Sequence, residues 1–262
     1  MGLDKMLAEK ADGIGRMIFN NPERRNAVSL EMWEAAEAIL NDFAADEAVR
    51  VVILSGAGGK AFVSGADISK FDKERSTPEG VAAYNARVDA IYRLVQNLPK
   101  PTIAEIDGYC IGGGLGLAVS CDLRFCSEKS RFGLPAARLG LGYRYEGLKR
   151  LVDTVGPGAA RDITFSARQL DAQEALRIGL VQKVLPEAEL ASFVADYART
   201  VACNAPLTVK GVKIMVNEAL KPETERDPEL CRRLVDEAFE SADYLEGRRA
   251  FAEKREPNFK GR

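Results

Sequence analysis

The sequence predicts an α/β protein in which a strand-rich body is followed by a helical C-terminal part. Over the first two thirds of its 262 residues, short β-branched runs alternate with segments whose apolar residues recur every three or four positions. Beyond about Glu187 only the helical pattern remains. A chain of this length suits one large domain, or one domain with a helical annex, because domains average about 150 residues.

Strands are expected where apolar and β-branched residues cluster. Residues 51–54 read Val-Val-Ile-Leu, an unbroken apolar run that is typical of a strand buried on both faces. The predicted strands cover residues 14–19, 49–55, 101–106, 122–126 and 181–185.

Helices are expected between these strands, and capping signals mark where they begin. Ser29 can cap the apolar-periodic segment that follows it. Thr77 stands directly before a proline, which is a favourable helix start. Asp171 with Glu174 resembles a capping box. Three or four helical patterns complete the chain, over residues 190–203, 206–220, 228–240 and 242–255.

Composition excludes several classes of function. Lysine plus arginine (37) nearly balance aspartate plus glutamate (39), so the net charge of −2 gives no electrostatic reason to expect a nucleic-acid partner. The absence of histidine excludes Ser-His-Asp and Cys-His catalysis and histidine-containing zinc sites. No stretch approaches the ~20 apolar residues of a membrane span. We therefore expect a cytoplasmic protein with no metal site and no membrane partner.

The cysteines predict no disulfide framework. Their number is odd, and no two of them have the C-x-x-C spacing. This usage fits reduced thiols in a cytoplasm. We expect each to be a buried structural residue. The cysteines are Cys110, Cys121, Cys126, Cys203 and Cys231.

Two glycine-rich stretches follow predicted strands and are the candidate ligand sites. They read FVSGADI over residues 62–68 and GYCIGGGLG over residues 108–116. Glycine lets a backbone approach a ligand closely, and a helix that starts there directs free N–H groups at an anion. Tight turns with close helix packing would leave the same composition. Neither stretch matches a phosphate-binding P-loop or a dinucleotide fingerprint.

With these two stretches, the chain closely resembles the enoyl-CoA hydratase/isomerase (crotonase) superfamily over nearly its whole length. The matching segments are residues 26–27, 60–68, 100–104, 107–109, 112–114, 121–123, 172–175, 179–181 and 251–255. The resemblance implies a spiral of repeated ββα units over residues 1–200. It implies a helical oligomerisation region over residues 201–262, with self-association as a trimer or hexamer.

The resemblance also implies an acyl-CoA substrate and an oxyanion hole for its thioester oxygen. The two backbone N–H groups of the hole map to Ala66 and Gly113. Such donors stabilise the negative charge that develops as an enolate forms. No separate cofactor is implied, because coenzyme A is part of the substrate. Further substrate contacts map to Asp67, Ile68, Ser69, Phe251 and Lys254, although Lys254 also fits a solvated helix charge.

One departure from the family's pattern concerns the reaction. Hydratases of this family use two glutamates, and their positions hold Gly116 and Ala136 here. General acid–base catalysis needs a titratable group within reach of the substrate. The chain thus resembles an atypical member that lacks both hydratase carboxylates. Arg144 stands where some isomerases, dehalogenases and thioester hydrolases carry aspartate.

Three readings of the reaction remain open. Tyr143 falls where the methylmalonyl-CoA decarboxylase branch carries tyrosine, and Tyr143 with Arg144 could hold a departing carboxylate. That branch has histidine at the position of Ala66, so the match is partial. Glu146 could instead serve as a relocated acid or base for hydration or isomerisation, or only compensate charge at a helix start. Tyr143 could equally be a packing residue. Finally, the chain could bind acyl-CoA without catalysis.

Overall fold

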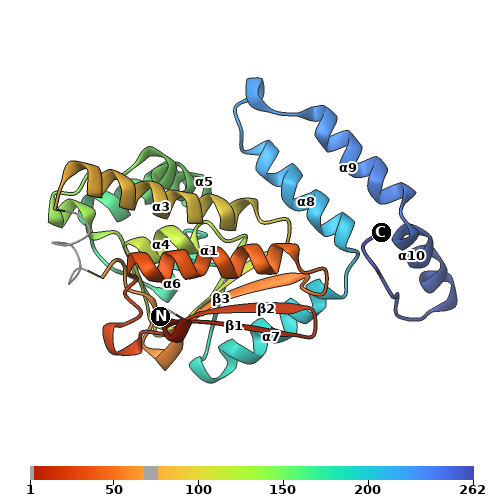
Figure 1. The fold of residues 1–262 in the computed structure, drawn as a ribbon, viewed down its shortest axis with the longest axis horizontal. Helices are drawn as coiled ribbons and strands as arrows, with labels where there is room; N and C mark the ends of the chain where they lie inside the picture. The colour runs from red at the N-terminus through yellow and green to blue at the C-terminus, as the bar shows by residue number, and fades with distance from the viewer. Residues whose placement is uncertain (1–2, 68–75) are drawn as a thin grey trace.

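A computed structural model describes residues 3–67 and 76–262 of the chain as an α/β fold with two sheets (Figure 1). The six-stranded sheet has the order β1-β2-β3-β5-β7-β10, and the four-stranded sheet has the order β4-β6-β8-β9. The strands are β1 (Met6–Ala11), β2 (Ile14–Phe19), β3 (Val51–Gly56), β4 (Ala61–Val63), β5 (Thr102–Ile106), β6 (Tyr109–Ile111), β7 (Leu123–Ser127), β8 (Arg131–Gly133), β9 (Leu170–Asp171) and β10 (Lys183–Leu185).

The α-helices lie against and beyond these sheets. They are α1 (Leu30–Ala45), α3 (Pro78–Asn97), α4 (Gly113–Ala118), α5 (Tyr145–Ser166), α6 (Ala172–Arg177), α7 (Glu187–Ala202), α8 (Pro206–Ala219), α9 (Pro228–Glu240) and α10 (Ala242–Glu253). Ser29 caps α1, Thr77 caps α3, and Asp171 with Glu174 forms the predicted capping box at α6. Over residues 3–67 and 76–262, no helix is long and apolar enough to cross a membrane.

The chain repeats a ββα unit, which confirms the predicted fold. β3, β5 and β7 pair in parallel in the large sheet, and β4, β6 and β8 pair in parallel in the small one. Each unit therefore adds one strand to each sheet before a helix, α3, α4 or α5, returns the chain. Because β4 and β6 are parallel neighbours, the loops that follow these two strands leave the small sheet at the same edge.

The central strand β3 is buried on both faces, as its apolar run predicts. Val52 and Leu54 point into the main core, which the helices α1, α3 and α4 complete. Val51 and Ile53 point the other way, into a second core against α7. Figure 1 shows α1 and α7 on opposite sides of the large sheet.

The strand β1 was not predicted from its sequence, MLAEKA. It pairs antiparallel with β2 along its whole length, and all its residues after Met6 are exposed. An edge strand with an open face needs no apolar alternation, so the periodic signal is absent.

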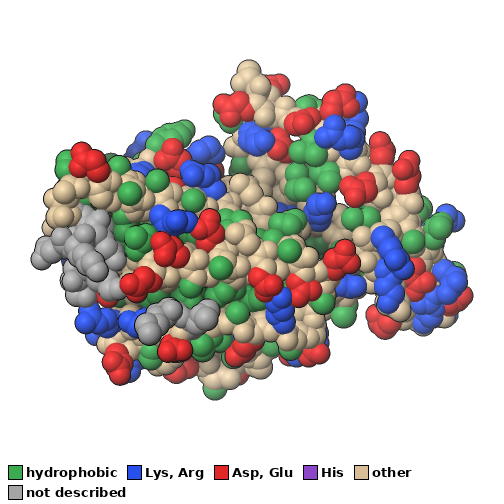
Figure 2. Space-filling model, viewed as in Figure 1, with side chains coloured by type: hydrophobic (Ala, Val, Ile, Leu, Met, Phe, Trp, Pro, Cys, Tyr) green, Lys and Arg blue, Asp and Glu red, His purple; other side chains and the backbone are tan. Residues whose placement is uncertain are grey.

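The last three helices extend away from the sheets (Figure 1). One ion pair anchors α8 to the body, because Lys213 Nζ lies 2.8 Å from an Asp122 carboxylate oxygen and donates to the Lys100 carbonyl at 3.0 Å. Figure 2 shows hydrophobic side chains gathered over α8 and α9 on the viewed face. Exposed apolar residues of these helices and of the α8 C-cap are Val212, Val216, Leu220, Val235, Phe239, Tyr244, Leu245 and Phe251.

The cysteines divide into two groups, so the expectation of five buried thiols was wrong in part. Cys110, Cys121 and Cys126 are buried in the core, whereas Cys203 is exposed and Cys231 is intermediate. Cys203 is the C-cap of α7, at the junction with the extended helices, and Cys231 lies on α9. Both stand outside the packed layers, where a side chain has fewer neighbours.

Candidate active site

The candidate site lies where the chain leaves the parallel strands β4 and β6. Gly65 follows β4 with a φ of +113°, and Gly112 follows β6 with a φ of +57°. Positive φ values are readily adopted by glycine because it has no Cβ atom. A Cβ atom on Gly112 would lie 3.9 Å from the Gly65 Cα atom. The two loops are therefore in near contact, and each continues into one of the predicted oxyanion-hole residues.

The backbone N–H of Ala66 is left available by the pairing of its neighbours. Ala66 forms a parallel bridge with Val28. In that bridge Val28 N–H donates to the Gly65 carbonyl at 2.9 Å, and Asp67 N–H donates to the Val28 carbonyl at 3.0 Å. The groups of the bridged residue itself point the other way. Ala66 N–H therefore points away from Val28, and it donates to no residue that the structure describes.

Gly113 supplies the second available N–H. Gly112 N–H donates to the Gly133 carbonyl at 2.8 Å, which ties the loop to β8. Gly113 is the first residue of α4, so its N–H has no acceptor within the helix. It also has no acceptor elsewhere in the described part of the chain. Ala66 and Gly113 are both partly exposed, so their N–H groups can meet a ligand.

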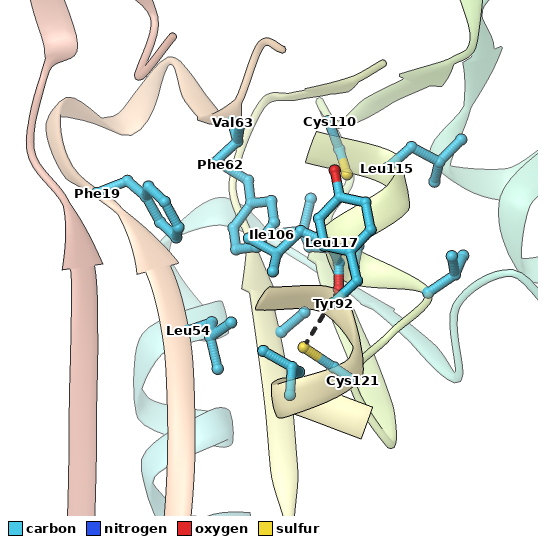
Figure 3. Close-up of a cluster of buried hydrophobic side chains, with 14 of the residues drawn as sticks. Phe19, Leu54, Phe62, Val63, Tyr92, Ile106, Cys110, Leu115, Leu117 and Cys121 are labelled. Atoms are coloured by element: carbon cyan, nitrogen blue, oxygen red, sulfur yellow. Dashed lines mark hydrogen bonds between the residues drawn. The ribbon is translucent and has the colours of Figure 1, made fainter. Parts of the chain in front are cut away.

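Tyr92 of α3 occupies the space beside Gly116. A Cβ atom on Gly116 would lie 2.9 Å from Tyr92 Cε2 and 3.0 Å from its hydroxyl oxygen. The same hydroxyl donates to the Gly113 carbonyl at 2.6 Å. Figure 3 shows Tyr92 together with Leu115 and Leu117, which α4 supplies. The space beside position 116 is thus filled by a phenol from another helix.

The Tyr92 ring is held from several sides. It packs edge-on against Trp33 with a ring-centroid distance of 5.9 Å, and the Arg150 guanidinium lies 5.5 Å from its centroid. Burial raises the pKa of the Tyr92 phenol well above its usual value. The hydroxyl is therefore a neutral hydrogen-bond donor at physiological pH. Arg150 itself is buried, and its Nε and Nη2 atoms have no hydrogen-bond partner among the described residues.

Arg144 has a different partner from the substrate carboxylate that we expected. Its Nε and Nη2 atoms each donate to an Asp89 carboxylate oxygen at 2.8 Å, and Nη1 donates to Asn85 at 2.8 Å. The planar guanidinium matches the two carboxylate oxygens, which makes this a strong bidentate pair. Arg144 therefore ties the start of α5 to α3 and does not offer a free cation to a ligand.

Tyr143 and Glu146 flank Arg144 on the accessible side of the same region. The Tyr143 side chain is 37% exposed, and its ring folds against the first turn of α5, within 3.3 Å of where a Cβ on Gly147 would lie. Glu146 is exposed and lies in that first turn. Both are open to solvent, Tyr143 just before the N-cap of α5 and Glu146 in its first turn.

The other predicted contacts are dispersed. Asp67 is 7% exposed and pairs with Arg24 at 3.2 Å. Ile68 and Ser69 lie outside the described residues. Phe251, which is 88% exposed, and Lys254 lie at the end of α10, away from α4 in Figure 1. Within one chain the fold does not bring them to Ala66 and Gly113.

Sequence reasoning missed Tyr92 and Arg150. Tyr92 follows Val88 by four positions and precedes Val95 by three, so periodicity could have placed it on the buried face of α3. No spacing rule could have linked it to Gly116, because that contact joins two elements packed only in three dimensions.

Comparison with known proteins agrees with this architecture. A family profile described as enoyl-CoA hydratase/isomerase matches residues 9–262. The chain is 35% identical to the short-chain-enoyl-CoA hydratase of Clostridium acetobutylicum, with both chains covered fully, and 34% identical to the crotonyl-CoA hydratase of Syntrophomonas wolfei, with 99% of each covered. A solved enoyl-CoA hydratase/carnithine racemase from Magnetospirillum magneticum matches with a TM-score of 0.93 at 34% identity, over 99% of this chain and 97% of that one. The chain therefore belongs to the enoyl-CoA hydratase/isomerase family.

Proposed function

We propose that this chain binds an acyl-CoA thioester with its carbonyl oxygen between the N–H groups of Ala66 and Gly113, and stabilises the enolate. The near contact of the Gly65 and Gly112 loops is the observation that carries the proposal. Two available hydrogen-bond donors, both backbone N–H groups, therefore lie on adjoining loops, and neither needs a side chain to bind the oxygen. One such donor typically contributes about 3 kcal/mol to the stability of the transition state.

We propose further that the reaction is a lyase reaction, namely decarboxylation of a malonyl-type thioester. The bond between C2 and the free carboxylate breaks, its electron pair moves into the enolate, and carbon dioxide leaves. A proton then adds to C2. This reaction needs no general base at position 116, where the Tyr92 ring fills the space, or at Ala136. Tyr143 is proposed to orient the departing carboxylate, with Arg144 holding the Tyr143 segment against α3.

Hydration or double-bond isomerisation is the alternative that the relatives favour, because those of Clostridium acetobutylicum and Syntrophomonas wolfei are named as hydratases. Glu146 is the carboxylate available for it, since it is exposed in the first turn of α5. In that case Glu146 would activate the water or move the proton.

Mass-spectrometric turnover of a thioester panel separates these reactions. The panel contains malonyl-, methylmalonyl- and ethylmalonyl-CoA, together with crotonyl-CoA, a longer 2-enoyl-CoA and a 3-enoyl-CoA. Loss of carbon dioxide from a malonyl-type thioester supports the lyase proposal, and Tyr143→Phe should then slow it. Gain of water by an enoyl thioester, abolished in Glu146→Gln, would replace it with hydration. Binding without any turnover, including isomerisation checked by chromatography, would favour a non-catalytic acyl-CoA-binding protein.

We also propose self-association as a trimer or hexamer through α8, α9 and α10. Support comes from the apolar side chains that these helices leave exposed, including Phe239 and Phe251 at 59% and 88% exposure. Contiguous exposed apolar surface of this kind marks interaction sites. Sedimentation as a monomer at micromolar concentration would contradict the proposal.

A further inference from the structure

We propose that Tyr92 is a positioning residue of this site, which fixes the first turn of α4 and excludes any side chain from position 116. The inference rests on the proposed function, because it takes the Gly113 N–H as a ligand of the thioester oxygen. It goes beyond that function because it makes a residue of α3 responsible for two things. Tyr92 holds the Gly113 N–H in place, and it prevents α4 from carrying an acid or base at position 116.

The first turn of α4 needs a tie from outside the helix. α4 has only six residues, and Gly113, Gly114 and Gly116 are three of them. Glycine is the poorest helix former after proline, and so short a helix has little stability of its own. The Tyr92 hydroxyl supplies the tie by donating to the Gly113 carbonyl at 2.6 Å. A shift of this turn would move the Gly113 N–H away from the line of approach shared with Ala66.

Each remaining glycine of α4 is required by a neighbour that presses against the helix. A Cβ on Gly114 would lie 2.0 Å from the Val63 carbonyl oxygen, so α4 lies directly against β4. The three atoms nearest to a Cβ on Gly116 all belong to Tyr92, at 2.9 to 3.1 Å. Distances this short cannot be accommodated unless the ring moves.

The ring cannot move cheaply. Tyr92 is 5% exposed, and Trp33 packs edge-on against it. Edge-to-face aromatic pairs stabilise a fixed ring orientation beyond the area that they bury. The Arg150 guanidinium lies across the ring as well. A carboxylate side chain at position 116 and a tyrosine at position 92 are thus mutually exclusive in this packing, and Tyr92 selects enolate chemistry without a base on α4.

The first test measures how strongly the site polarises a bound thioester. The probe is butyryl-CoA labelled with carbon-13 at the thioester carbonyl, and the readout is the infrared shift of that carbonyl on binding. Tyr92→Phe keeps the ring and removes only the hydroxyl. Tyr84→Phe is the matched control, because it removes another buried hydroxyl of α3, one that accepts from Trp33 Nε1 at 3.2 Å.

The expected result is a large shift in the wild-type protein and in Tyr84→Phe, and a shift at least halved in Tyr92→Phe. With the thioester that turns over, kcat should fall about 10-fold in Tyr92→Phe, the effect of one lost hydrogen bond, with KM within about twofold. Equal shifts and equal kcat in folded Tyr92→Phe would overturn the positioning role. A wild-type protein that binds the probe without any shift would instead refute the oxyanion hole itself.

The second test is a stability cycle that needs no substrate. Gly116→Ala raises helix propensity, so without steric conflict it should stabilise α4. We expect it to lower the urea midpoint in the wild-type background and to raise the midpoint in the Tyr92→Leu background. The same sign in both backgrounds would show that Tyr92 does not exclude a side chain at 116. Should Tyr92→Leu prove too unstable to measure, Trp33→Phe, which removes part of the packing around the Tyr92 ring, takes its place. In that background the drop in urea midpoint caused by Gly116→Ala should become smaller, and an unchanged drop would contradict the steric exclusion.

Discussion

Replacing Asn26 by aspartate should destabilise the protein in a pH-dependent way. Asn26 is fully buried, and its Nδ2 atom donates to the Ala61 carbonyl at 2.7 Å and to the Ala57 carbonyl at 3.0 Å. Its Oδ1 atom accepts from Asn21 N–H at 2.8 Å. These bonds hold the start of β4, five residues before Ala66. Aspartate has the same shape, but it has a carboxylate oxygen in place of the Nδ2 group. That oxygen cannot donate to the Ala57 and Ala61 carbonyls.

The magnitude follows from the groups left without partners. Two hydrogen bonds are lost, at about 1 kcal/mol each, and the buried acceptors they leave unsatisfied cost about 1 kcal/mol or more. A desolvated carboxylate facing two carbonyl oxygens adds to this at neutral pH. We therefore expect a loss of about 4 kcal/mol in the free energy of unfolding at pH 7.

The pH dependence has a definite sign. Burial and the facing carbonyls favour the protonated form, so the pKa of Asp at position 26 is raised on folding. A raised carboxyl pKa destabilises the folded state above the unfolded value of about 3.9, and protonation restores a donor as the pH falls. The difference in the free energy of unfolding between wild type and Asn26→Asp should therefore become smaller as the pH falls.

Urea unfolding followed by circular dichroism at pH 7 and pH 5 measures both effects, at one fixed protomer concentration because self-association would couple to stability. Asn20→Asp is the matched control, since the Asn20 side chain makes one exposed bond, to the Asp4 carbonyl at 2.8 Å. It should change stability by less than about 1 kcal/mol. A deficit for Asn26→Asp below about 1 kcal/mol at pH 7, or one that grows at pH 5, would refute the reasoning.

Three further outcomes follow from the described contacts. In the native protein a thiol reagent should modify the exposed Cys203 but not the three buried cysteines, whose pKa values burial raises, and mass spectrometry counts the adducts. Arg144→Ala removes the bidentate pair to α3, and faster proteolysis near Tyr143 would report the loosened segment. Lys213→Met removes an ion pair in which only the lysine is buried, since Asp122 is exposed and keeps its bonds from Thr102. Urea unfolding should show a loss of about 2 kcal/mol, against near-neutral change for Lys60→Met at an exposed lysine.

The alternation of strands and helices was predictable because its signals are local. β2 begins and ends where the sequence predicts, and the capping box at Asp171 forms as expected. Apolar period and capping chemistry act over a few residues, so they survive in the sequence alone. The short strands β6 and β8 gave no such signal, because three residues cannot display a period.

The candidate site likewise has parts that the sequence predicts and parts that it does not. Gly65 and Gly112 could be recognised from the sequence as candidate ligand-binding turns, because glycine adopts positive φ values more readily than other residues. The role of Arg144 was not predictable, since its choice of Asp89 over a ligand depends on how α3 packs beside α5.

By itself the sequence determined the α/β class, the order of its main elements, the glycine loops and the absence of carboxylates at positions 116 and 136. These are properties of composition and local spacing. Only the tertiary structure decided that Tyr92 fills the space beside Gly116 and that Arg144 is already paired. Both follow from close packing of helices distant in the chain, where a contact depends on the positions of two side chains at once and leaves no trace in either segment alone.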